Sequence, residues 1–184
     1  MGNTAGFSAL LIREYIVKLS GKDGLKKALA LLSTDDQKKI DRLGPKEWVP
    51  YEYYFRLLRA GAAATGVEES EFCRRFGEYQ VEHDNHFLYS LALKVGGPRL
   101  MVIEASQIWK RYHNTGKLVI EEYFPNQTRG RLVGVEGGGP MLCEVVAGFM
   151  DAGLRLAGAR VASVRHSRCI HRGDDCCEYT AEWK

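Results

Sequence analysis

The sequence predicts an α+β domain in which a helical N-terminal region is followed by an antiparallel sheet with a helix packed on it. Two observations indicate this fold class. Through the first two thirds of the 184-residue chain apolar residues recur at helical spacing, whereas after Lys117 short β-branched, aromatic and alternating runs take over. We therefore expect one domain, 1–184, divided into a mainly helical region over 1–115 and a hairpin, helix and second hairpin over 116–184.

Glycine and proline divide the helical region. The helical period of the first segment ends at Gly21, and Pro50 is suited to the first turn of a later helix. Gly97, followed by proline, marks a further break. The predicted helices span 7–19, 23–32, a short segment ending near 44, 51–64, 68–86, 87–95 and 100–112.

The C-terminal region has the alternating pattern of strands. Residues 118–124 and 129–135 are predicted to form a hairpin, and a helix over 141–156 follows a run of glycines and ends at Gly158. A strand over 160–166 and another over 176–183 complete the chain. In the last strand Cys177, Tyr179, Ala181 and Trp183 share one side, which we expect to face the core.

Charge and composition exclude several kinds of partner. The 26 basic and 23 acidic residues are mixed along the chain and give a net charge of +3, so no basic block is available to follow a nucleic-acid backbone. No apolar stretch has the length of a membrane span, and no signal peptide is evident, so we expect a cytoplasmic protein. In that compartment the five cysteines are expected to be reduced thiols or metal ligands.

Four residues near the C-terminus have the spacing of a metal site. Cys143 lies on the predicted helix, His166 and Cys169 end one strand, and Cys177 begins the next. Thiolate and imidazole are the ligands that tetrahedral zinc prefers, so these residues predict a structural zinc site. The alternative is a core of small buried residues in which His166 is hydrogen-bonded internally.

The order of these elements, with the turn 171–174 between Cys169 and Cys177 and the closing Trp183, resembles the 4-vinyl reductase-like domain. That family belongs to the ligand-binding superfamily of nitric-oxide signalling and Golgi transport, which includes TRAPP subunits and, more distantly, haem nitric-oxide-binding domains. The resemblance covers residues 130–184. It implies a dimeric small-molecule sensory domain, similar to those of phenol- and toluene-responsive activators, with zinc held at the four positions. His166 departs from the family pattern, which has a carboxylate there.

Aromatic residues of the helical region and first hairpin are candidates for lining an apolar ligand pocket, with core packing or a dimer interface as the alternative. The candidates are Phe87, Trp109, Tyr112 and Tyr123. Neither a phosphate-binding glycine motif nor the Tyr-x-Ser-x-Arg signature of haem nitric-oxide sensors is present, so no nucleotide or haem cofactor is predicted.

The sequence thus favours a cytoplasmic, homodimeric sensory domain that encloses a small hydrophobic ligand, carries a structural zinc ion and acts through a signalling partner protein. The first alternative is a reductase-like enzyme acting on a tetrapyrrole vinyl group. Because no flavin or nicotinamide motif is present, enzymatic activity ranks below binding. The second alternative is a dimeric scaffold similar to the TRAPP subunits.

Overall fold

The computed structural model describes residues 1–83, 88–160 and 162–184, and gives side chains for all of these except 88–94. The helices are α1 (Gly6–Ala30), α2 (Thr34–Arg42), α3 (Tyr51–Thr65), α4 (Glu69–His83), α5 (Leu88–Ile103), α6 (Ala105–Tyr112) and α7 (Pro140–Leu156). The strands are β1 (Asn3–Ala5), β2 (Trp48–Pro50), β3 (Lys117–Phe124), β4 (Gln127–Val133), β5 (Ala162–Arg168) and β6 (Cys177–Trp183), with a 3₁₀ turn over Ile170–Arg172.

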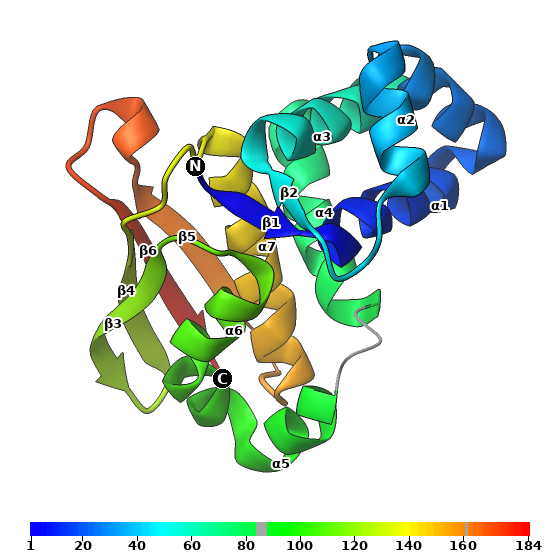
Figure 1. Cartoon of the computed structure of the whole chain (residues 1–184). Helices are drawn as coiled ribbons and strands as arrows, with labels where there is room; N and C mark the ends of the chain where they lie inside the picture. Colours follow the sequence, from blue (N-terminus) through cyan, green and yellow to red (C-terminus); the bar gives the residue numbers. More distant parts are fainter. Residues whose placement is uncertain (84–87, 161) are drawn as a thin grey trace.

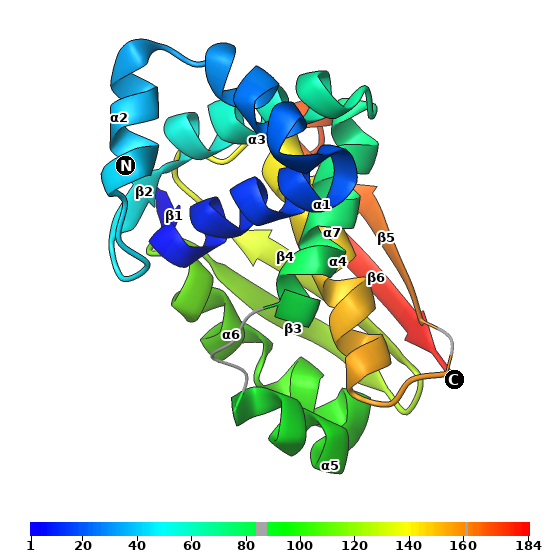
Figure 2. The ribbon, with the colours of Figure 1, turned by 90° about the vertical axis from the view of Figure 1, so that its right-hand side faces the viewer.

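An antiparallel sheet of four strands forms one side of the molecule (Figure 1). Its strand order is β3-β4-β6-β5, and the register pairs Leu118 with Leu132 and Leu132 with Cys177. Helix α7 packs on the sheet and lies between it and the N-terminal helices (Figure 2). The predicted α+β class, with a helical N-terminal region, a hairpin, a helix and a second hairpin, is confirmed.

Two glycines interrupt helices where the sequence predicts a break. Gly21, with φ of 67°, divides α1, and Gly97, with φ of 68°, divides α5. Both adopt the left-handed region that a side chain disfavours, so each helix changes direction at its glycine.

Glycines also allow α4 and α7 to cross at backbone contact. A Cβ at Gly77 would lie 2.1 Å from the carbonyl oxygen of Val145, and a Cβ at Gly148 would lie 1.9 Å from that of Arg74. This crossing holds the N-terminal helices against the layer formed by α7 and the sheet.

Buried apolar side chains of the described residues form two clusters, and helix α7 contributes to both. One joins α1, α3 and α4 through residues such as Ile12, Leu58 and Phe72, and the other joins α7 to the sheet through Leu142 and Tyr179. Among the described residues, no helix is both long and apolar enough to span a membrane.

Candidate functional site

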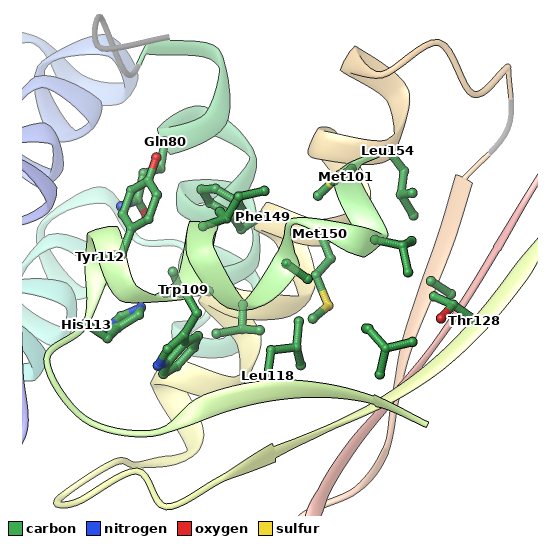
Figure 3. Close-up of a pocket in the computed structure, with 17 residues that line it drawn as sticks. Gln80, Met101, Trp109, Tyr112, His113, Leu118, Thr128, Phe149, Met150 and Leu154 are labelled. Carbon is green, nitrogen blue, oxygen red and sulfur yellow. The ribbon is translucent and has the colours of Figure 1, made fainter. Parts of the chain in front are cut away.

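A cavity of about 90 Å³ lies between α5, α6 and α7 on one side and the sheet on the other (Figure 3). Most of its wall is aliphatic, aromatic or thioether surface, and no described lining residue carries a full charge. The lining residues are Gln80, Met101, Val102, Ala105, Ile108, Trp109, Tyr112, His113, Leu118, Ile120, Thr128, Val145, Val146, Phe149, Met150, Leu154 and Ala181.

The polar side chains in the wall hydrogen-bond to the protein itself. Gln80 donates through Nε2 to Ser8 Oγ at 2.8 Å, and Thr128 donates through Oγ1 to the carbonyl oxygen of Glu122 at 2.7 Å. Trp109 donates through Nε1 to the carbonyl oxygen of Thr115 at 2.9 Å. A molecule bound in the cavity would therefore make mainly dispersion contacts with the wall.

His113 occupies one end of the cavity. It follows the last residue of α6, its ring stacks on Trp109 with centroids 4.0 Å apart, and its Nδ1 lies 2.9 Å from Tyr51 Oη. Burial lowers the pKa of His113 from 6.5 to about 3, because the charged imidazolium would lose its hydration. At neutral pH the ring is uncharged, in keeping with the apolar wall.

Two of the four residues predicted to line a ligand pocket are found in the wall of this cavity. Trp109 and Tyr112 line the cavity. Tyr123 does not, because the far end of β3 points its ring toward Trp183 and leaves the residue 40% exposed. Phe87 lies outside the described residues.

Sequence reasoning missed most of the wall. Met101, Phe149 and Met150 carry no mark that separates a cavity lining from ordinary core, and His113 was not predicted to be a site residue. The apolar face of α7, which includes Val146, Met150 and Leu154, was an available signal, but its period indicates only burial.

The structure brings together the four residues of the predicted metal site, which we call the Cys/His cluster: Cys143, His166, Cys169 and Cys177. Their potential ligand atoms all lie within 4.8 Å of one another, and the sulfur atoms of Cys143 and Cys177 are 3.7 Å apart. Helix α7 supplies Cys143, while β5, the residue after it and the start of β6 supply the others.

Burial governs the charges of the Cys/His cluster. It raises the pKa of Cys143 and of Cys177, because a buried thiolate loses its hydration. Burial also lowers the pKa of His166 to about 4, with Arg172 adding to the effect. His166 Nε2 is buried without a hydrogen-bond partner, its ring stacks on Tyr179, and Nδ1 lies 4.0 Å from Glu144 Oε1.

Comparison with solved structures places this fold among H-NOX proteins. An H-NOX protein from K. algicida in the unliganded Fe(II) state is 12% identical with a TM-score of 0.74, covering 98% of this chain and 96% of that one. An S. oneidensis H-NOX protein in the Fe(II)NO state is 15% identical with a TM-score of 0.74, covering 98% and 99%. No protein-family model matches the sequence, and no curated protein matches it either.

These structures correct the family resemblance inferred from the C-terminal residues. The similarity to H-NOX structures extends along almost the entire chain, so the 4-vinyl reductase-like and TRAPP-like assignment is wrong, and the vinyl-reductase alternative has no support. The short pattern around Cys169 and Cys177 directed the assignment to another family with a similar order of elements.

The cofactor expectation is corrected as well. The sequence suggested structural zinc and no haem, whereas the H-NOX structures are described by the ligation state of their iron. A further match, with a TM-score of 0.70 and 12% identity, concerns haem redox potential and porphyrin distortion. Haem, and not zinc, is thus the cofactor named for proteins of this fold.

The cavity walls allow a test of whether this chain's residues fit a haem. His113 offers an imidazole, and its contact with Tyr51 at Nδ1 leaves Nε2 as the ring nitrogen that could bind iron. Haem propionates need cationic or hydrogen-bonding partners, and the described lining includes neither lysine nor arginine. A volume of about 90 Å³ is also below the roughly 150 Å³ of a cavity that holds benzene. The described residues, as arranged, do not fit the group.

Proposed function

We propose that this chain is a small-molecule sensing domain whose ligand is a small, uncharged, apolar molecule bound directly in the cavity. The observation that supports the proposal most strongly is the wall itself, in which Gln80, Thr128 and Trp109 direct their polar groups into the protein. A charged or strongly polar guest would lose its hydration and gain little in return.

The size of the cavity narrows the guest further. A cavity of about 90 Å³ is suited to a diatomic gas, a noble-gas atom or a short hydrocarbon. A larger ring would bind only if the lining side chains moved apart. Because α5 and α6 form one side of the wall, a molecule bound in the cavity would contact these helices and change their positions. Sensing would then consist of a shift between two arrangements of this wall.

Xenon binding followed by NMR tests the proposal directly. We expect xenon to shift the methyl signals of Ile108, Leu118 and Met150. Val146→Leu should reduce this response, because Val146 lines the cavity. Val81→Leu should leave it unchanged, because Val81 is buried but is not one of the lining residues. Shifts spread over the whole molecule, or a response insensitive to Val146→Leu, would refute the proposal.

A parallel incubation with haemin separates this function from haem-based sensing. Direct binding predicts that the protein acquires no stoichiometric, sharp Soret band. A stoichiometric band that disappears in His113→Ala, with xenon shifts absent, would instead make the chain a haem protein.

We also propose that the Cys/His cluster ligates a metal ion. The closeness of its four ligand atoms and the unpartnered Nε2 of His166 support this. Elemental analysis of the purified protein should find about one transition-metal ion per chain, lost in Cys177→Ser and retained in Cys73→Ser, whose thiol lies outside the cluster. The metal site would be excluded if the purified wild-type protein contained no metal and its free energy of unfolding were the same with and without added metal.

The expected setting of such a sensor is a reducing cytoplasm, with two copies of the chain associating and a partner protein receiving the signal. None of the five cysteines forms a disulfide, which suits that compartment. Sedimentation velocity with and without xenon tests the dimer and its dependence on the ligand.

A further inference from the structure

The N-terminal helical layer carries a groove beside α2 and β2. Figure 2 shows where these two elements lie. The groove encloses about 510 Å³, and neither the cavity nor the Cys/His cluster shares a residue with it. Cationic side chains of α2 form one wall, namely Lys38, Lys39 and Arg42. Trp48 of β2 contributes to the other wall.

Trp48 is exposed in a way that the other tryptophans are not. Its exposed fraction is 48%, against 5% for Trp109 and 7% for Trp183. Strand β2 directs Val49 inward at 2% exposure, so the alternation of the strand directs Trp48 outward. Tryptophan and arginine are enriched at the centres of protein interfaces, where a large apolar surface is covered by a partner.

Among the described residues, the cations of α2 form no close ion pair, although Lys39 contributes to the lowered pKa of Asp36. In the part of the chain that the structure describes, Lys38, Lys39 and Arg42 form no salt bridge, although Arg56, nearby in the groove, is paired with Asp36. Lys38 and Arg42 are four residues apart on one face of α2, so their charges repel each other. An anionic partner would relieve that repulsion.

We propose that this groove docks an acidic segment of a partner protein, with an apolar side chain of that segment covering Trp48. A protein segment is favoured over nucleic acid for two reasons. Phosphates repeat at every nucleotide and would also lie against Glu47 and Glu52, which line the groove, whereas a protein segment can place its carboxylates toward α2 alone. In addition, the three cations of α2 are fewer than the roughly six to ten phosphate contacts of a typical duplex-binding protein.

A labelled peptide of alternating Glu and Phe serves as the probe, with fluorescence anisotropy as the readout. We expect the full-length protein to bind it, and binding to weaken as salt is raised. Lys38→Glu/Lys39→Glu and Trp48→Ala should each weaken binding about tenfold. Lys22→Glu/Lys27→Glu, an exposed pair on α1 outside the groove, makes the same change in net charge and should leave binding within about twofold.

Three results would overturn the proposal: no peptide binding up to about 1 mM, equal losses in the groove and α1 variants, or tighter binding of a labelled DNA duplex than of the peptide. Circular dichroism of each variant shows whether it is folded. The intrinsic fluorescence of Trp48, which is lost in Trp48→Ala, shows separately whether the peptide reaches the groove.

Discussion

Tyr51 and His113 join the cavity to the N-terminal layer through a buried contact of 2.9 Å between Oη and Nδ1. Tyr51 is the first residue of α3, and its backbone N–H donates to the carbonyl oxygen of Gly2. Thr4, two residues after Gly2, donates through Oγ1 to the carbonyl oxygen of Tyr112, beside His113. The end of α6 that closes the cavity is thus held by the N-terminus and by α3.

The buried neutral imidazole of His113 predicts a loss of stability in mild acid. In the unfolded chain the ring binds a proton below pH 6.5, but in the folded protein it does so only near pH 3, so the unfolded state gains the proton first. The free energy of unfolding should therefore fall from pH 7 to pH 5, with about 2 kcal/mol of the loss due to His113. Urea unfolding at the two pH values measures it.

His113→Asn is the matched control for this pH dependence. Asparagine keeps a polar atom near Tyr51 but does not titrate, so its loss between pH 7 and pH 5 should be smaller than the wild-type loss by that amount. His166 titrates in both proteins and cancels in the comparison. Equal losses in the two proteins would mean that the folded protein readily accepts the proton on His113.

Local rules predicted much of this fold, and long-range relations account for what they missed. The breaks at Gly21 and Gly97 follow from glycine's backbone freedom, and strand alternation correctly places Cys177 in the core. Strands β1 and β2 are only three residues long, and each exists because the other pairs with it. No periodicity can develop over three residues, so this pairing had no sequence signal.

The Cys/His cluster and the cavity differ in how far local sequence features could predict them. The Cys/His cluster was predictable because its chemistry is carried by rare residue types. Most of the cavity lining was not, since the cavity depends on how residues such as Met101 of α5 and Phe149 and Met150 of α7 pack against one another. The family assignment failed for a related reason, because identities of 12–16% to the H-NOX structures leave the fold with almost no residue-level signature.

The crossing of α4 and α7 should tolerate no side chain at Gly148. The added methyl of Gly148→Ala would collide with the backbone carbonyl of Arg74, which cannot rotate away. We expect a loss of about 3 kcal/mol or more in the free energy of unfolding. Gly44→Ala is the control, because its Cβ would meet only ordinary contacts at 3.5 Å or more, and its effect should be small. Similar losses in both variants would contradict this role of the crossing.

Filling the cavity should separate stability from ligand binding. Val146→Leu adds a methylene group to a wall with space beside it, so its free energy of unfolding should stay the same or rise by up to about 0.8 kcal/mol. Val81→Leu adds the same group to a packed site and should cost about 1–3 kcal/mol. Thermal and urea unfolding of the two variants provide the measurement. A larger loss for Val146→Leu than for Val81→Leu would show that the cavity is not available space.

The ion pair of Asp36 with Arg56 should contribute far more to the free energy of unfolding than the ion pair of Arg59 with Glu69. Both arginines lie on α3. Arg56 donates through Nε and Nη2 to both oxygens of Asp36, at 2.8 and 2.9 Å, and the Asp36 side chain is only 6% exposed. Removing the guanidinium in Arg56→Met leaves a buried carboxylate unpaired, which we expect to cost about 2 kcal/mol at pH 7. Arg59→Met breaks an exposed pair with Glu69 and should cost less than about 0.5 kcal/mol.

The pH dependence of this ion pair gives a second check. The hydrogen bonds from Arg56 lower the pKa of Asp36 below 3.8, so its contribution is complete above that pH and is lost as the pH falls through the folded-state pKa. The difference in unfolding free energy between wild-type protein and Arg56→Met should therefore be constant from pH 7 to pH 5 and shrink below pH 4. A difference that persists undiminished at pH 3 would assign the loss to the packing of the arginine side chain and not to its charge.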